Sequence, residues 1–151
     1  MLARYMLLAM RWTKLNTTFD ADPNSPRPRV TVAGDRVTIE FFLNSFIWND
    51  VQPDDKATLT FTGAFVYRLG STNDEGFYRG QCRFSESGIG WGDFYELHDS
   101  RWQQGFPADK VVLAVPGVVP TGMKHYLYYF RDETFECVAQ NYEFQRIGRG
   151  T

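Results

Sequence analysis

Apolar and polar residues alternate with a period of two along much of this chain, which is the pattern of half-buried β-strands. The clearest case is the pair of runs at residues 29–33 and 36–43, the second of which carries Val, Ile, Phe and Leu at alternate positions. Gly34-Asp35 separates the two runs. A two-residue hairpin turn needs a positive φ, which glycine supplies at its first position. The sequence therefore predicts a β-hairpin here.

The same alternation predicts a long strand at residues 57–68, and Gly63 within it indicates a bulge, a bend or a close packing neighbour. At residues 124–147, two aromatic-rich runs flank a short charged break. We predict two antiparallel strands there, joined by a tight turn at the charged break Arg131-Asp132-Glu133. Further strands are expected at residues 77–84, 91–97 and 110–115, the last of them short and buried.

About eight or nine strands with regularly spaced turn signals predict an all-β, mainly antiparallel fold. We expect a single domain spanning residues 1–151, a β-sandwich or a flattened β-barrel with at most one or two short helices. Residues 13–28 contain three prolines and are predicted to be a long extended loop within the domain. Residues 1–12 fit either a helix or a strand.

Composition gives this fold a large core and argues against several functional classes. Of the 151 residues, 43% are hydrophobic and 17% are aromatic, so a few side chains can bury a large apolar area. The net charge is −2 without a concentrated basic stripe, which argues against nucleic-acid binding. The longest apolar runs fall far short of the roughly 20 residues of a membrane span. Cys82 and Cys137 are predicted to be buried, reduced thiols, which favours a cytoplasmic protein.

Catalytic signals are weak. The chain has no metal-ligand spacing, phosphate-binding loop or serine-nucleophile motif, so neither a metal nor a cofactor is expected. His98 follows a predicted strand, two residues after Glu96, and we expect it to be exposed. His125 would lie opposite Gln140 if the turn falls at residues 132–133. Glu136 would then be about 13 Å away along the strand, too far for a catalytic pair.

Aromatic and polar residues gather along the predicted strands and turns between residues 68 and 102. Exposed Trp and Tyr anchor many binding surfaces, and they form stacking platforms for sugars and bases. The alternative is that the tryptophans fill the core at the ends of the sheets. The candidate binding residues are Arg68, Asn73, Asp74, Glu75, Tyr78, Trp91, Asp93, Tyr95 and Trp102.

Three functions stay open. The first, favoured by small size, mild acidity and many aromatic residues, is a non-catalytic protein-binding module such as an intracellular inhibitor or immunity-type protein. The second is a small-ligand-binding barrel, whose interior would be lined by Phe61, Phe65, Tyr126 and Tyr128. The third is an enzyme with a carboxylate and histidine site in an aromatic cleft, built from His98, Asp93 and Glu96.

The expected partner is another protein, and neither nucleic acid nor a membrane is expected. An unpaired edge strand would also allow the chain to form a homodimer.

Overall fold

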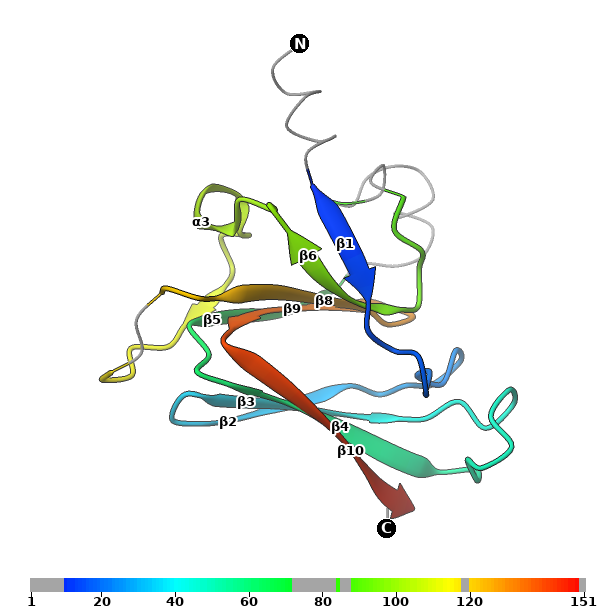
Figure 1. The fold of residues 1–151 in the computed structure, drawn as a ribbon. Coiled ribbons are helices and arrows are strands. Elements are labelled where there is room, and N and C mark those ends of the chain that lie inside the picture. Colours follow the sequence, from blue (N-terminus) through cyan, green and yellow to red (C-terminus); the bar gives the residue numbers. More distant parts are fainter. Residues whose placement is uncertain (1–9, 72–83, 85–87, 118–119, 150–151) are drawn as a thin grey trace.

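The computed structural model describes residues 10–71, 84, 88–117 and 120–149, which form an antiparallel β-sandwich (Figure 1). Ten strands in two sheets and one short helix, α3 (Trp102–Gly105), lie within these described residues. In spatial order, the six-stranded sheet contains β1 (Arg11–Lys14), β6 (Phe94–His98), β8 (Lys124–Tyr129), β9 (Glu133–Ala139), β5 (Val66–Ser71) and β7 (Val111–Val112). The four-stranded sheet contains β10 (Asn141–Arg149), β4 (Asp55–Thr62), β3 (Arg36–Phe42) and β2 (Arg29–Ala33).

The core lies between the two sheets and is built from the alternating positions seen in the sequence. Val37, Ile39 and Phe41 of β3 are all buried, and the predicted β2–β3 hairpin turns at Gly34 with a φ of 62°. From the facing sheet, alternate residues of β8 and β9 enter the same space. Aromatic contacts across it include Phe61 with Tyr126, whose ring centroids lie 5.2 Å apart.

Two segments predicted as single strands each divide between the two sheets. The strand expected at residues 57–68 is wrong as one element: β4 ends at Thr62 and β5 begins at Val66 in the other sheet. Gly63 makes the bend with a φ of 62°, and the side chain of Gln140 occupies the place where a Cβ would sit. At Gln140 the chain crosses back, so residues 124–147 hold three strands rather than two (Figure 1).

Other boundaries differ from the sequence-based expectation for local reasons. The segment at residues 110–115 is an edge strand of two residues, and its Val111 and Val112 are 43% and 52% exposed rather than buried. β1 extends to Lys14, inside the region predicted as loop. The strand expected at residues 77–84 lies almost wholly outside the described residues. No helix in the described part of the chain is long and apolar enough to span a membrane.

The two central strands of the six-stranded sheet, β8 and β9, are buried on both faces, and the outer face holds the polar residues considered below. Along β8, Tyr126 and Tyr128 point into the sandwich core, whereas His125, Leu127 and Tyr129 point outward. A second apolar cluster covers part of this outer face. Helix α3 and the segments around it lie on the same side of the sheet (Figure 1). Polar groups on this face are therefore enclosed by the protein without belonging to the main core.

Candidate functional site

A buried histidine–glutamate pair bridges two neighbouring strands on the outer face. His125 of β8 is paired with Val138 of β9, so Glu136 is its diagonal neighbour on the same face. His125 Nε2 lies 3.0 Å from Glu136 Oε1, and the two side chains are 1% and 3% exposed. The predicted separation of these residues was wrong. The turn lies at residues 131–132, one position earlier than expected, and this shifts the partner of His125 from residue 140 to residue 138.

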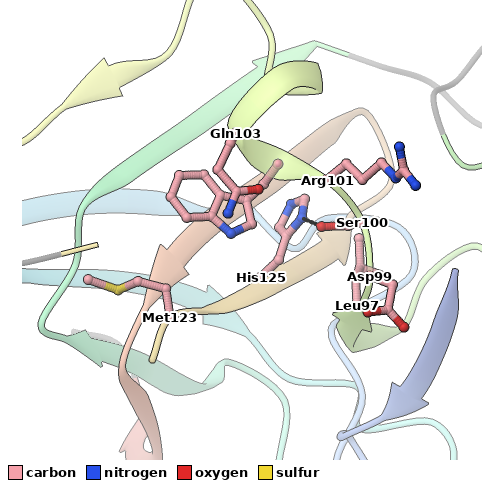
Figure 2. Close-up of a pocket in the computed structure, with 8 residues that line it drawn as sticks. Leu97, Asp99, Ser100, Arg101, Gln103, Met123 and His125 are labelled. Atoms are coloured by element: carbon pink, nitrogen blue, oxygen red, sulfur yellow. Dashed lines mark hydrogen bonds between the residues drawn. The ribbon is translucent and has the colours of Figure 1, made fainter. Parts of the chain in front are cut away.

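Ser100 completes a chain of three hydrogen-bonded side chains. Leu97, in β6, pairs with His125, and the loop that follows brings Ser100 over the imidazole ring. Ser100 Oγ lies 2.6 Å from His125 Nδ1 (Figure 2). The hydroxyl and the carboxylate thus bind opposite nitrogens of one imidazole.

The backbone on both sides of Ser100 is held in a conformation that side chains other than glycine rarely adopt. Asp99 has a φ of 58° and Arg101 a φ of 55°. This left-handed region costs a residue such as Arg101 about 1–2 kcal/mol, whereas aspartate visits it more readily. Such residues concentrate at functional sites, where the surrounding structure holds a side chain in a required position. Here the two unusual residues flank Ser100, whose hydroxyl contacts the His125 imidazole.

Burial determines which hydrogen bonds this arrangement needs. An ionised carboxylate shielded from water needs a hydrogen-bond donor. When Glu136 is ionised, His125 Nε2 donates a hydrogen bond to it. The lone pair of Nδ1 then accepts the hydrogen bond that the Ser100 hydroxyl donates. In this state the serine has a base in contact with its proton.

Ser100 and His125 line a surface cavity with a volume of about 510 Å³ (Figure 2). In Figure 2 the guanidinium group of Arg101 points away from the imidazole ring of His125. A cavity of this size lies within the range of small-molecule sites. Its lining residues are Leu97, Asp99, Ser100, Arg101, Trp102, Gln103, Met123 and His125.

The imidazole is enclosed by aromatic rings, and an ion pair fastens one of the covering segments. The ring centroids of Phe84 and Phe106 lie 6.0 Å and 5.7 Å from that of His125. Three residues beyond Phe106, Asp109 Oδ1 accepts a hydrogen bond of 2.6 Å from Arg68 Nε. This hydrogen bond lowers the pKa of the Asp109 carboxyl below its ordinary value. We call this ion pair the clasp.

The predicted binding residues fall into three groups. Arg68 forms the clasp, and Trp102 lines the cavity beside Ser100. Trp91, Asp93 and Tyr95 lie near the start of β6, away from the clasp. The remaining candidates, Asn73, Asp74, Glu75 and Tyr78, lie outside the described residues. Binding at these positions stays a prediction.

Two residues of the group at the start of β6, Trp91 and Asp93, line a second cavity of about 260 Å³. The ring of Trp91 stacks on Tyr129 at 4.8 Å. Asn16 Nδ2 donates hydrogen bonds of 2.9 Å to both Asp20 and Asp93, bringing the two carboxyl groups together. Burial, followed by the effects of Asp93, raises the pKa of Asp20 although a hydrogen bond from Trp48 opposes this. These acidic groups are already satisfied by protein donors.

The other histidine has similar partners but a different setting. His98 Nε2 lies 2.9 Å from Thr13 Oγ1, and its Nδ1 lies 3.4 Å from Glu96 Oε2. Its side chain is 33% exposed, so it is half-buried rather than fully exposed as expected. The arrangement lies at the edge of the sheet, where β1 pairs with β6.

Sequence reasoning missed Ser100 and rejected the pairing of His125 with Glu136. The sequence did contain one signal. Once the turn of the β8–β9 hairpin is placed correctly, Glu136 becomes the diagonal neighbour of His125 on the same face of the sheet. The described residues contain no group of three or more His, Cys, Asp or Glu side chains placed to hold a metal ion. Comparisons of the chain with protein-family models, with curated proteins and with solved structures found no match.

Proposed function

We propose that this protein is a serine hydrolase that cleaves small esters, with Ser100 as nucleophile, His125 as general base and Glu136 as the group that orients His125. One observation carries the proposal: a continuous hydrogen-bonded chain runs from a buried carboxylate to a serine hydroxyl at a cavity. A nucleophile in contact with a base, which is itself oriented by a third group, is the arrangement that activates serine. An enzyme was the third of the functions left open by the sequence, and this proposal uses different residues from those named there.

The reaction needs only groups present in the chain, the ester and water. Ser100 Oγ forms a bond to the ester carbonyl carbon while its proton moves to His125 Nδ1, and the carbonyl π electrons move onto oxygen. When the carbonyl re-forms, the bond to the alcohol oxygen breaks and the alcohol leaves with the proton from Nδ1. Water then attacks the acyl-serine by the same route, releasing the acid and restoring the Ser100 hydroxyl. Glu136 remains ionised and stabilises the imidazolium that forms in each half-reaction.

The test compares two matched hydroxyl substitutions. With p-nitrophenyl acetate as substrate, Ser100→Ala should lower kcat/KM at least about 100-fold, because the nucleophile is lost. Thr13→Ala removes the hydroxyl beside the other histidine and should leave kcat/KM within about twofold of the wild type. Mass spectrometry after treatment with a fluorophosphonate should place one adduct on Ser100. Equal activity of wild type and Ser100→Ala, or labelling elsewhere, would overturn the proposal.

A second candidate, protein binding, is favoured by one surface feature. Phe46 and Ile47 are 72% and 64% exposed at the tip of the loop between β3 and β4. Both backbone N–H groups are directed to Asn44 Oδ1, so the turn holds these side chains outward. A partner that requires this tip should be retained by the wild type and lost by the Phe46→Ser, Ile47→Ser double variant. Equal retention would remove the tip from consideration.

A cytoplasmic location is part of the same proposal. Cys137 is a free, buried cysteine, and its burial raises the pKa of the thiol. An inert, reduced thiol is consistent with a reducing compartment. Fractionation of the source cells with an antibody against the protein would test this location.

The core does not favour the ligand-binding barrel. Phe61, Tyr126 and Tyr128, expected to line its interior, are buried against neighbouring rings between the sheets. Phe65 contacts Trp102 at the surface, with 5.9 Å between the ring centroids. We therefore place ligand binding at the outer face of the six-stranded sheet.

A further inference from the structure

Within the described residues, the two sheets end in the edge strands β1, β7, β10 and β2, which differ in how they are protected. Proteins protect a strand edge by keeping the strand short, by interrupting it with a bulge or by placing charged residues on it. β7 is two residues long, β1 begins and ends with a basic residue, and β10 has a register shift between Arg146 and Gly148. β2 instead pairs with β3 in unbroken register, and its charged residue, Arg29, stands at its start. β2 is therefore the least protected of these edges.

The hairpin turn determines which backbone groups of β2 face away from the sheet. The residues that flank the two-residue turn Gly34-Asp35, Ala33 and Arg36, exchange both of their backbone hydrogen bonds. Because this pattern alternates along an antiparallel pair, Val30 and Val32 direct their N–H and C=O groups away from β3. Among the described residues, no backbone hydrogen bond from another segment reaches these two valines. They therefore offer backbone donors and acceptors along the free edge.

The side chains of β2 suit contact with another strand. Val30 and Val32 lie on the inner face of the sheet, because they pair with the buried residues Ile39 and Val37. Val32 is nevertheless 41% exposed, since it stands at the margin of the core. Thr31 lies between the two valines on the outer face and is exposed. A strand added at this edge would cover the exposed valine and would meet an uncharged residue at the centre of β2.

The edge is complementary to a second copy of itself. When two copies of β2 pair antiparallel about a two-fold axis at Thr31, Val30 of each chain lies opposite the partner's Val32. These are the residues whose backbone groups point outward, so each opposed pair of valines exchanges both backbone hydrogen bonds. Arg29 then lies opposite the partner's Ala33, which keeps like charges from facing each other. The outward groups, the apolar side chains and the charges therefore match in one register.

We propose that this protein forms a two-fold symmetric homodimer through β2, which joins the two four-stranded sheets into one continuous sheet. The occupant is a second copy because the spacing that sets the valines opposite each other belongs to the sequence of β2 itself. Pro28 has no N–H and limits the pairing to the five residues of the strand, so the interface is smaller than the roughly 1,000 Å² of stable complexes. The dissociation constant should therefore lie between about 1 μM and 1 mM. β2 belongs to the sheet that does not carry Ser100, so this inference stands independently of the hydrolase.

Sedimentation equilibrium over a range of protein concentrations tests the dimer. The average mass of the wild type should rise from monomer towards dimer as the concentration passes through the dissociation constant. Thr31→Lys places two lysines opposite each other at the two-fold axis, and this repulsion should weaken the dimer at least about tenfold. Gln145→Lys is the matched control, because it adds the same charge at an exposed position of β10, the other edge of the same sheet. It should leave the dissociation constant within about twofold of the wild type.

A mixture of Thr31→Lys and Thr31→Glu tests the register, since an axis at Thr31 sets residue 31 of one chain opposite residue 31 of the other. Each variant alone should be mainly monomeric, whereas the mixture should form a heterodimer at least as tight as the wild-type dimer. Failure of the mixture to associate would overturn this register. A wild type that stays monomeric up to about 1 mM would overturn the inference in favour of a different occupant of the edge. Equal dimerisation of the wild type and Thr31→Lys would place the contact elsewhere and would overturn it too. Circular dichroism spectra of the variants should match that of the wild type, because both positions are exposed.

Discussion

The two histidines of this chain contact the same kinds of group, yet their surroundings differ sharply. Each imidazole lies between a glutamate and a hydroxyl-bearing side chain: Glu136 and Ser100 for His125, Glu96 and Thr13 for His98. The His125–Glu136 distance is 3.0 Å with side chains 1% and 3% exposed. The His98–Glu96 distance is 3.4 Å with side chains 33% and 20% exposed.

This difference shows that residue types alone do not make a reactive site. Water and salt screen the half-exposed pair around His98, so its electrostatic coupling is weak. Around His125 the protein replaces water, which makes each hydrogen bond stronger and each missing partner costly. The hydroxyl partners differ as well: Thr13 belongs to the regular strand β1, whereas Ser100 is held by a strained loop at a cavity.

The largest expected effect is the loss of kcat/KM when Glu136 is neutralised, compared with the same substitution at Glu96. Glu136→Gln keeps the size of the side chain but removes the charge that stabilises the imidazolium of His125. We expect kcat/KM for p-nitrophenyl acetate to fall by about 10³-fold, within the range for general acid–base catalysis. Glu96→Gln makes the same chemical change beside His98 and should alter kcat/KM less than twofold.

Measuring kcat together with the melting temperature separates a catalytic role of Glu136 from a structural one. If Glu136 merely supports the fold, Glu136→Gln should lower the melting temperature while leaving kcat and its pH dependence unchanged in the remaining folded protein. We expect instead a loss in kcat for a variant that is folded at the assay temperature. Similar losses for the two glutamine variants would remove the distinction between the histidines.

The next effect is on stability and compares the histidines directly. His125→Ala leaves Glu136 buried without one of its partners, and this should lower the free energy of unfolding by about 3 kcal/mol or more. His98→Ala removes a half-exposed contact and should cost less than about 1 kcal/mol. Denaturant titrations of both variants measure the difference. Equal losses would show that the buried pair does not contribute more to the fold than the half-exposed pair.

Much of the fold could be predicted because period-two patterning is a local property. The β2–β3 hairpin and its turn at Gly34 follow from the sequence directly. The crossings at Gly63 and Gln140 could not be read in the same way, because the apolar alternation continues on both sides while the strand changes sheets. Period-two patterning shows which residues share a face but not which sheet that face belongs to.

The candidate site depended on two facts that a single sequence does not contain. A turn placed one residue too late moved Glu136 about two strand positions away from where it lies relative to His125. Ser100 comes from a loop with no periodicity, and only the fold brings it over the β8 strand. The expected aromatic cluster was easier to find, since Trp91, Tyr95 and Trp102 are conspicuous by residue type alone.

A smaller effect tests the strained loop that distinguishes Ser100 from Thr13. Arg101→Gly and Arg101→Ala both remove the guanidinium group, but only glycine adopts a φ near 55° without a steric penalty. The glycine variant should therefore be more stable than the alanine variant by about 1 kcal/mol. Thermal unfolding of the pair measures this difference directly. An alanine variant as stable as the glycine variant would show that the backbone at residue 101 is not strained.

The smallest effect concerns the clasp, which fastens the Phe106 segment over His125 and has no equivalent among the contacts described for His98. Its hydrogen bond from Arg68 lowers the pKa of Asp109 below the ordinary value of 3.8. A carboxyl whose pKa is lower in the folded state stabilises the fold above its unfolded pKa, and this contribution disappears as the pH falls through the folded pKa. Asp109→Asn should therefore lower the melting temperature at pH 7 and have less effect at a pH low enough to protonate wild-type Asp109. Asp50→Asn, which breaks an exposed ion pair with Arg146 on the other sheet, controls for the loss of a surface charge. If Asp109→Asn lowers the melting temperature equally at both pH values, ionisation of Asp109 is not what holds the segment over His125.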